Sequence, residues 1–412
     1  MNTTRPPMPR LLLIFLIIPS ASLAQVYNLV GQVLDGQTEE PIPFATVYLN
    51  KTTVGTSTSL EGEYTLAFNP TVVNQSSIEL VISCIGYEPL VYPLTLEQLN
   101  KRYVFKLAPR QEVLDEIIVN AERDEVWYLN LETFKEEFLG RSEFGSQCEI
   151  LNVNDLIIMY REEENLLQVS ARAPLQIKNA LLGYDIEYLL EEFTYQVSKG
   201  QVYFAGYSFY QEAKGGRLRQ KQWAKNRLRA YNGSSIHFLK SVYQQQLVEN
   251  GFNLRKLYRL PNPERPSEEE MQAYGEAIRA GGFESLSEAQ RDIGRRARLP
   301  EFVQYLDINA VDYSSYLNIQ DGARILSFPD FFQVVYTGEM EEQNYVYHTS
   351  HPFGRTRKPS YQTSVVSLTV DATVLEDNGI TSNAFDLVFE GYWAWEKLGE
   401  MLPLGYEPLG EL

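Results

Sequence analysis

The sequence is poor in the side chains that most often build catalytic and metal sites. Its 412 residues include only two cysteines and three histidines. A zinc site of the common hydrolase type needs a His followed three residues later by a Glu, together with a distant second His. His237, His348 and His351 all lack a Glu at that spacing. The sequence therefore predicts no metal site, and His348 and His351 are best interpreted as loop residues.

Nucleophile motifs are equally scarce. Cys148 and His237 would form a thiol and base pair only by chance, since they lie far apart in the sequence. Ser142 lies in a near match to the Gly-x-Ser-x-Gly elbow, but it follows a predicted helix where the elbow needs a strand. No phosphate-binding glycine loop is present, and the 54 acidic residues single out no catalytic pair. We expect no catalytic residue and no cofactor.

Basic residues are also fewer than acidic ones. The 36 basic residues against 54 acidic ones give a formal net charge of −18, which disfavours nucleic acid and anionic membranes as partners. The first 24 residues combine Arg5 and Arg10, an apolar run and a small-residue end, the order of a secretory signal peptide. No later run is long and apolar enough to span a bilayer. We expect an exported chain starting near Gln25, in the periplasm or associated with the outer membrane.

Residues 25–108 alternate short β-type runs with turn residues, as in a sandwich. Seven strands are predicted. The central one carries Ile78, Leu80, Ile82 and Cys84 on one face, a period of two that is expected when a single face is buried. Export would permit a Cys84–Cys148 disulfide, whereas the apolar position of Cys84 favours free thiols.

Several motifs in this region resemble the carboxypeptidase-D regulatory-like domain. That family has a transthyretin-like or Ig-like β-sandwich and is found beside metallocarboxypeptidases and at the N-terminus of TonB-dependent receptors of Gram-negative bacteria. The resemblance implies a fold and carries no carboxypeptidase activity to this chain. The matching segments are VGQVLD (30–35), EPIPFATV (40–47), VGTST (54–58), EGEY (61–64) and IGYE (85–88).

The segment LDEIIV (114–119) is similar to the linker that precedes the plug of such receptors, although an edge strand or plain linker is the favoured interpretation. A receptor would also need a barrel of roughly 22 long strands. The remaining residues are too few for that barrel. The chain is therefore not itself the transporter.

The rest of the sequence predicts a larger β-rich α+β domain. Asn130 is a candidate N-cap for a short helix that ends at Gly140, and residues 235–250 predict a helix closed by Gly251. Ser267 with Glu270, and Ser285 with Glu288, have capping-box spacing. Strands are expected at residues 301–308, 331–336, 345–347 and 365–375 among others, and Asn378-Gly379 indicates a hairpin turn.

This second region resembles exported bacterial proteins named only for their N-terminal carboxypeptidase-like regulatory domain. The resemblance brings no known reaction or ligand. It rests on FKEEFLG (134–140), CEILN (148–152), PLQIKN (174–179), LGY (182–184), YNGSSIHFL (231–239) and LPLGY (402–406). The predicted organisation is a signal peptide (1–24), a sandwich (25–108), a linker (109–130) and an α+β domain (131–412) with a charged helical insertion at about 261–299.

Two clusters suggest binding surfaces. A basic stripe recurs every fourth residue on a predicted helix over residues 218–230, either as a solvated face or as a docking surface for an acidic partner or anionic glycan. It consists of Arg217, Lys221, Lys225 and Arg229, with Trp223 between them. Tyrosines also gather at positions 184, 188, 195, 203, 207 and 210, as sheet core or as a sugar-stacking surface.

The sequence as a whole favours an exported, non-catalytic envelope protein that acts as an accessory or scaffold through protein contacts, for example with an outer-membrane nutrient-uptake system. One alternative is a carbohydrate-binding protein, since sandwiches of this shape often hold sugars. A second is an unrecognised hydrolase in the C-terminal domain.

Overall fold

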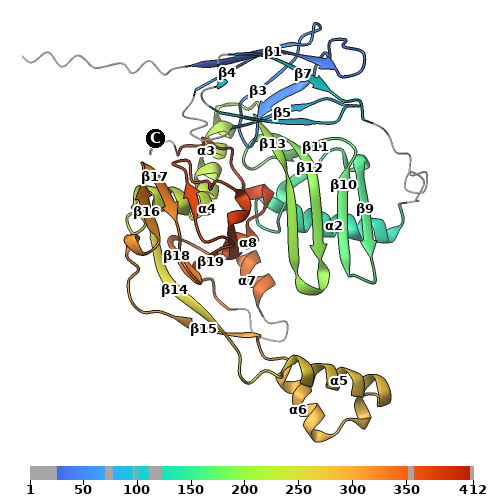
Figure 1. Ribbon diagram of the computed structural model, residues 1–412, viewed down its shortest axis with the longest axis vertical. Coiled ribbons are helices and arrows are strands. Elements are labelled where there is room, and N and C mark those ends of the chain that lie inside the picture. Colours follow the sequence, from blue (N-terminus) through green and yellow to red (C-terminus); the bar gives the residue numbers. More distant parts are fainter. Residues whose placement is uncertain are drawn as a thin grey trace, which may run out of the picture.

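The computed structural model describes residues 26–69, 78–95, 98–99, 101–110, 123–350 and 357–408. The expected signal peptide at residues 1–24 and the linker motif at 114–119 lie outside the described residues. The described chain is mostly β, with an N-terminal sandwich followed by a larger β-rich α+β region (Figure 1).

Seven strands form the sandwich, as the period-two pattern predicts. One sheet has the order β4-β1-β7 and the other β3-β2-β5-β6, and β1 runs parallel to β7. Leu29, Leu66 and Leu80 are among the apolar side chains buried between the sheets. The strands are β1 (Tyr27–Asp35), β2 (Thr46–Leu49), β3 (Gly55–Ser57), β4 (Glu63–Phe68), β5 (Ile78–Ser83), β6 (Leu90–Leu94) and β7 (Arg102–Leu107).

The expectation that β5 buries a single face is wrong. Leu80 and Ile82 face the sandwich core as predicted, but Val81 on the opposite face is also fully buried. Val81 packs with Tyr48 of β2 against Phe209 from the following region. The outer face of this sheet is therefore an internal surface of the protein.

After the sandwich, helix α2 lies on a six-stranded sheet and starts at Glu125, inside the predicted linker (109–130). In that sheet β12 is the long central strand, flanked on one edge by β11 and β10 and on the other by β13. Leu131, Phe134 and Phe138 of α2 are buried against it. The elements are α2 (Glu125–Phe138), β8 (Cys148–Ile150), β9 (Leu156–Arg161), β10 (Leu166–Ala171), β11 (Leu175–Asn179), β12 (Tyr184–Gln196) and β13 (Gln201–Glu212).

The proposed Asn130 cap is wrong, because α2 begins earlier. Its N-cap is Asp124, whose side chain accepts a hydrogen bond from the Trp127 backbone N–H at 2.8 Å. The apolar stripe used for the prediction covers only the C-terminal part of the helix. The first turn remains helical because a capping carboxylate satisfies its free amide.

A second core forms around a five-stranded sheet of order β15-β14-β18-β19-β21 and a three-stranded sheet of order β16-β17-β20. Phe238, Phe252 and Trp393 are part of it. The strands are β14 (Phe252–Pro261), β15 (Phe302–Leu306), β16 (Leu317–Gln320), β17 (Ala323–Leu326), β18 (Phe331–Met340), β19 (Tyr361–Leu368), β20 (Thr373–Leu375) and β21 (Leu387–Gly391). The helices are α3 (Arg217–Tyr231), α4 (Ser235–Gln244), α7 (Gln343–Thr349) and α8 (Tyr392–Trp395).

Two boundaries here differ from expectation. Residues 345–347 are not a strand but lie inside α7. Helix α4 stops at Gln244 because Gln245 adopts a left-handed conformation (φ +58°), several residues before Gly251. Short 3-10 turns occur at Gly145–Gln147, Val153–Asp155, Val197–Lys199, Phe283–Ser285, Tyr313–Ser315, Ala384–Asp386 and Leu398–Glu400.

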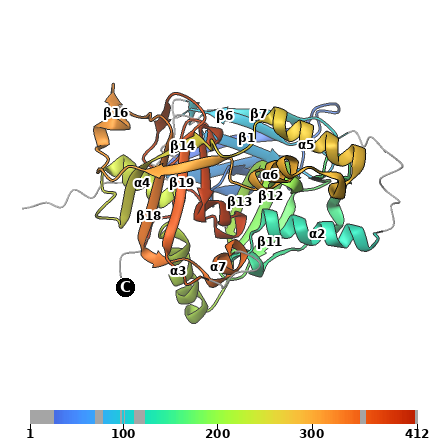
Figure 2. The ribbon, with the colours of Figure 1, turned by 90° about the horizontal axis from the view of Figure 1, so that it is seen from below.

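A pair of helices, α5 (Glu268–Gly281) and α6 (Glu288–Arg296), is inserted between β14 and β15 and projects from the body (Figure 1). In the view from below, the pair lies in front of the sheets (Figure 2). The Ser267–Glu270 capping box is confirmed. The second predicted box is wrong, because α6 is capped by Ser287 with Gln290. Neither helix contains a fully buried residue, so the pair contributes little to the main cores.

Candidate functional site

Helix α3 presents the basic stripe to solvent. Arg217, Lys221 and Lys225 are exposed, and none of the three makes an ion pair or side-chain hydrogen bond with the part of the chain that the structure describes. Residues four apart in a helix rise about 6 Å along its axis and stay on one side. Three unpaired cations therefore form a row, which is defined here as the α3 stripe.

The other two predicted members turn away from it. Trp223 is buried, its ring lies against Gly183, and its indole N–H donates to the Ala180 carbonyl at 3.0 Å. Arg229 pairs with Glu143 at 2.6 Å, and its guanidinium lies 4.4 Å from the centre of the Phe144 ring. The structure thus separates an anchoring face of α3 from the exposed stripe.

The orientation of Arg227 and the exposure of Leu218 on this helix were not predicted. Arg227 also faces inward, donating to the Leu182 and Gly183 carbonyls and pairing with Glu212. Leu218, by contrast, is 86% exposed beside the stripe. The helical spacing already carried both signals, because residue 218 falls on the side opposite Trp223 and residue 227 on the same side.

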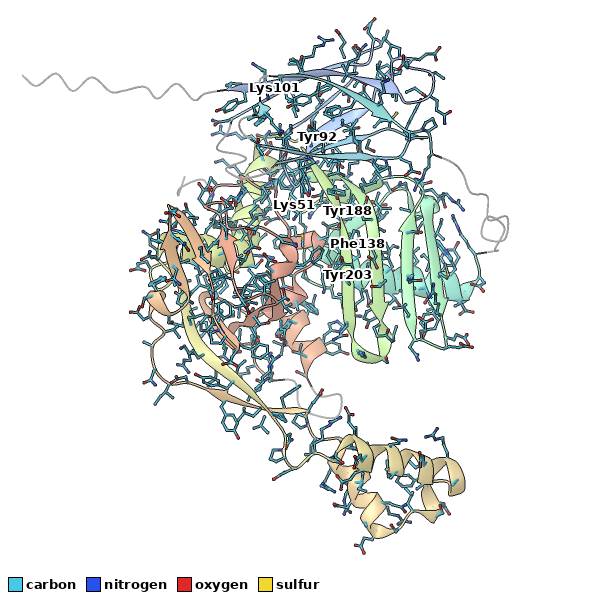
Figure 3. All side chains as sticks on the ribbon, viewed as in Figure 1. Lys51, Tyr92, Lys101, Phe138, Tyr188 and Tyr203 are labelled. Atoms are coloured by element: carbon cyan, nitrogen blue, oxygen red, sulfur yellow. The ribbon has the colours of Figure 1, made fainter. Side chains whose placement is uncertain are left out.

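The sandwich is joined to the six-stranded sheet by backbone pairing as well as by apolar contact. The Lys51 N–H donates to the Ser208 carbonyl at 2.7 Å, and the Tyr210 N–H donates to Thr52 at 3.0 Å. The Tyr48 and Phe209 rings stack beside these bonds at 5.2 Å. Lys51 lies where the two bodies meet (Figure 3). This junction holds the sandwich in a defined orientation.

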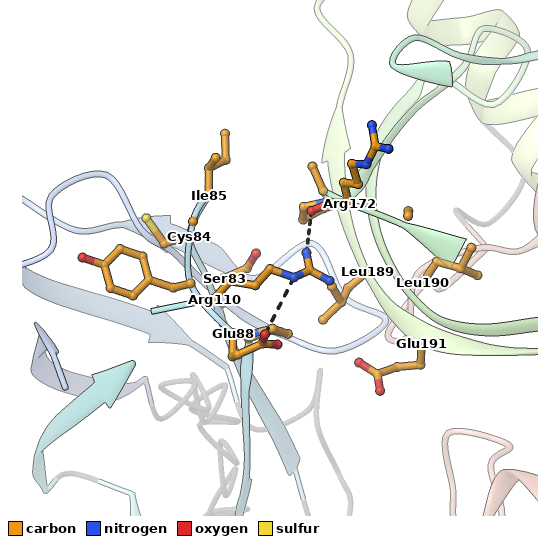
Figure 4. Close-up of a pocket in the computed structure, with 15 residues that line it drawn as sticks. Ser83, Cys84, Ile85, Glu88, Arg110, Arg172, Leu189, Leu190 and Glu191 are labelled. Carbon is orange, nitrogen blue, oxygen red and sulfur yellow. Dashed lines mark hydrogen bonds and ion pairs between the residues drawn. The ribbon is translucent and has the colours of Figure 1, made fainter. Parts of the chain in front are cut away.

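A pocket of about 210 Å³ lies at the edge of the same junction. Arg110 spans it, with its guanidinium donating to the Arg172 carbonyl and lying 3.7 Å from Glu88 (Figure 4). The Cys84 side chain also lines the pocket, and burial raises the pKa of its thiol. The cation at the centre of the pocket already has protein partners, so the pocket serves mainly to link the two bodies.

Several carboxyl groups cluster where the loop after α2 meets the end of β18 and the segment after α8. Burial raises the pKa of Glu396 well above its ordinary value, and repulsion from Glu400, Glu342 and Glu339 adds to this. Burial likewise raises the pKa values of Glu339 and Glu342. Burial and mutual repulsion thus both favour the protonated forms of these acids.

Glu400 is the member with the most defined surroundings. Burial raises its pKa to about 8, a hydrogen bond with Ser142 opposes the rise, and the Glu342 charge adds to it. Arg229 lowers this pKa and Glu143 raises it by smaller amounts. Perturbed carboxyls are found both at catalytic sites and in structural clusters.

Among the described residues, neither cysteine has the lowered pKa of an activated thiol. Both cysteines are free. Burial raises the pKa of Cys148 to about 12, and burial lowers the pKa of His237 to about 4. His237 Nδ1 accepts a hydrogen bond from the Gly233 N–H. A thiol and a neutral imidazole in these states do not provide a thiolate nucleophile at neutral pH.

The described ranges contain no group of three or more His, Cys, Asp or Glu side chains that could hold a metal ion. His348 lies in α7 and not in a loop as expected, and its ring is tilted against that of Trp395 with centres 5.5 Å apart. His351 lies outside the described residues. No described helix is long and apolar enough to cross a membrane.

Most of the clustered tyrosines belong to the core. Tyr184, Tyr188 and Tyr210 are buried in the six-stranded sheet, and Tyr188 packs edge-on against Phe138 at 5.1 Å (Figure 3). Tyr203 is partly exposed but stacks on Phe385 at 5.7 Å. The cluster therefore does not form a continuous aromatic platform.

The comparisons with known proteins identify the sandwich. Residues 29–119 match the family model of the CarboxypepD_reg-like domain. The N-terminal sandwich is thus a carboxypeptidase regulatory-like domain, in agreement with its motifs and fold. No curated protein matches the chain significantly.

Two solved structures share distant similarity. A protein from Bacteroides fragilis, described as membrane-associated and of unknown function, is 10% identical over 89% of this chain and 93% of its own, with a TM-score of 0.16. A 9R-lipoxygenase from Cyanothece is 10% identical over 55% of this chain and 48% of its own, with a TM-score of 0.17. Scores this low carry no inference about fold or function.

Proposed function

We propose that this protein is an exported, non-catalytic accessory or scaffold protein of the Gram-negative envelope, in the periplasm or at the outer membrane. It acts through protein contacts, with an outer-membrane nutrient-uptake system as one such setting. The regulatory-like sandwich and the signal-peptide pattern of the first 24 residues support this proposal. The observation that carries it is the exposed, unpaired α3 stripe on a chain of net charge −18.

The stripe fits an acidic protein surface. Arg217, Lys221 and Lys225 lie in a row about 6 Å apart, and Trp223 anchors the opposite side of α3 to the body. A rigid row of cations gives an oriented attractive field, which speeds association and selects against basic partners. Salt weakens such an interface, because the screening length is about 8 Å at physiological ionic strength.

The hydrolase alternative has one observation in its favour, the buried carboxyl cluster around Glu400. A protonated acid beside ionised neighbours is what a general acid requires. Turnover of glycoside or peptide substrates that Glu400→Gln abolishes would establish this alternative. The accessory function predicts no turnover in either form.

Cross-linking in the envelope followed by purification tests the proposed function. The expected result is a cross-linked partner recovered in a fixed ratio to this protein. Recovery of the protein alone under all growth conditions would overturn the proposal. A glycan array examines the carbohydrate-binding alternative, for which the accessory function predicts no signal.

A further inference from the structure

Strand β15 is an open edge of the five-stranded sheet, in which it pairs only with β14 within the described structure. The Asp307 N–H donates to the Lys256 carbonyl, and the Asn262 N–H donates to the Glu301 carbonyl, both at 2.9 Å. Hydrogen-bonded residues alternate along an antiparallel pair. The odd-numbered residues of β15 therefore bond to β14, and the backbone groups of Phe302, Gln304 and Leu306 point outward.

The side chains of this edge are uncharged and, apart from Gln304, apolar or aromatic, and most are accessible. Phe302, Tyr305 and Leu306 are 42%, 53% and 41% exposed. On the neighbouring strand Leu260 is 54% exposed opposite Val303, and Tyr258 is paired with Tyr305. An uncharged, aromatic-rich edge with free backbone groups is a template for another strand.

Two other sheet edges, β7 and β6, carry the usual protection against strand addition. Strand β7 has Arg102 and Lys106, and strand β6 has Pro93. Charged residues and prolines at an edge block further pairing. Strand β15, with the sequence FVQYL, has neither. The edge strands β3 (GTS), β16 (LNIQ) and β20 (TVL) also lack both, but they are shorter than β15, which therefore offers the longest unprotected edge among these four strands.

We propose that the β15 edge binds an extended segment of a partner protein, which adds to the five-stranded sheet as a further antiparallel strand. The segment has alternating apolar residues and is flanked by Lys or Arg. Exposed Glu301 and half-buried Asp307 bracket the strand without ion-pair partners in the described structure, and they attract basic flanks. A second copy of β15 is a poorer partner, because a two-fold pairing centred on Gln304 places Glu301 opposite Asp307.

Synthetic peptides test this on the full chain. One probe has the sequence Lys-Val-Thr-Val-Thr-Val-Lys, and its matched control has Glu at both ends. Hydrogen exchange read at single-residue resolution should slow at the amides of residues 302, 304 and 306 when the Lys-flanked peptide is added. The amides of residues 303 and 305 should be slow already. The Glu-flanked peptide should bind at least about tenfold more weakly.

A pair of variants separates backbone pairing from side-chain contact. Gln304→Pro removes one outward N–H without touching a bond to β14, and proline is tolerated at edge strands. It should weaken peptide binding at least about tenfold, whereas Gln304→Ala should change it about twofold or less. Unchanged exchange with the Lys-flanked peptide, or equal binding by Gln304→Pro, would overturn the inference.

Two controls settle the choice of partner and site. Sedimentation of the protein alone should show a monomer, and a dimer that Gln304→Pro dissociates would assign the edge to a second copy and overturn the proposed partner. This inference extends the proposed function to a second surface. Replacing the α3 stripe should leave peptide binding intact, so failure at one surface is distinguishable from failure at the other.

Discussion

Replacing Glu400 by Gln should stabilise the protein at mildly alkaline pH. The ordinary pKa of this carboxyl is 4.5, and burial raises it to about 8 in the folded protein. The folded state therefore binds more protons than the unfolded state between these values. Stability contributed by this group is complete below pH 4.5 and is lost as the pH rises towards 8. A neutral Gln has no such dependence.

The size of the effect follows from the pKa difference. One pKa unit corresponds to about 1.4 kcal/mol, so the loss between pH 5 and pH 8 is at most about 3.5 kcal/mol. Glu400 as a whole residue is only half-buried, and solvent screening reduces the expected loss to about 2 kcal/mol. The charges facing it are those of Glu396, Glu342, Glu143 and Arg229.

Urea unfolding of wild type and Glu400→Gln at several pH values measures the difference directly. The two proteins should have similar stability at pH 5, and the variant should be more stable by about 2 kcal/mol at pH 8. The other acids with raised pKa contribute a slope in both proteins. In the variant, the loss of the Glu400 charge also reduces the repulsion that raises the pKa of Glu396, which favours the variant in the same direction. A variant that is less stable than wild type at pH 8, or that follows the same pH curve, would refute this reasoning.

Three further predictions concern the fold. Phe209→Ala should lower the free energy of unfolding by about 3 to 5 kcal/mol, because this ring fills the contact between sandwich and sheet. Limited proteolysis of the variant should then release the sandwich. A variant that stays uncleaved would contradict a junction of this strength. Tyr48→Phe should leave the free energy of unfolding unchanged or raise it by about 1 kcal/mol, since the buried hydroxyl has no hydrogen-bond partner in the described structure. A large decrease of this free energy in chemical denaturation would count against the prediction. Cys148 should resist thiol reagents at pH 8 until the protein unfolds, because burial raises its pKa to about 12, and rapid labelling of the folded protein would disprove it.

Local patterns predicted the sandwich well because alternating apolar and polar residues indicate its strands. The burial of Val81 was not predictable in that way, since its cover, Phe209, comes from a distant part of the chain. The helix caps show the same difference between features that a local pattern indicates and features that it does not. Ser267 and Glu270 form the expected box, whereas the start of α2 depends on Asp124, which lies outside the apolar stripe.

The candidate site was partly predictable for similar reasons. The fourfold spacing of Arg217, Lys221 and Lys225 places them together on any helix. Trp223 lies two residues from Lys221, about 200° around the helix, so helical geometry alone places it on the other side. Arg229 does not join the exposed stripe because it pairs with Glu143, and helix spacing does not specify this tertiary contact. The open edge of β15 likewise depends on sheet order, which the strand's own sequence does not specify.

The most direct test of the accessory function compares cross-linking yields of three proteins in the native envelope. One is wild type, the second carries Glu at Arg217, Lys221 and Lys225, and the third carries Glu at Lys101, Lys178 and Lys199. The last three residues are also exposed, so both variants change the net charge equally. The α3 stripe variant should lose the cross-linked partner while the control retains it. Equal yields from the two variants would contradict a docking role for the stripe.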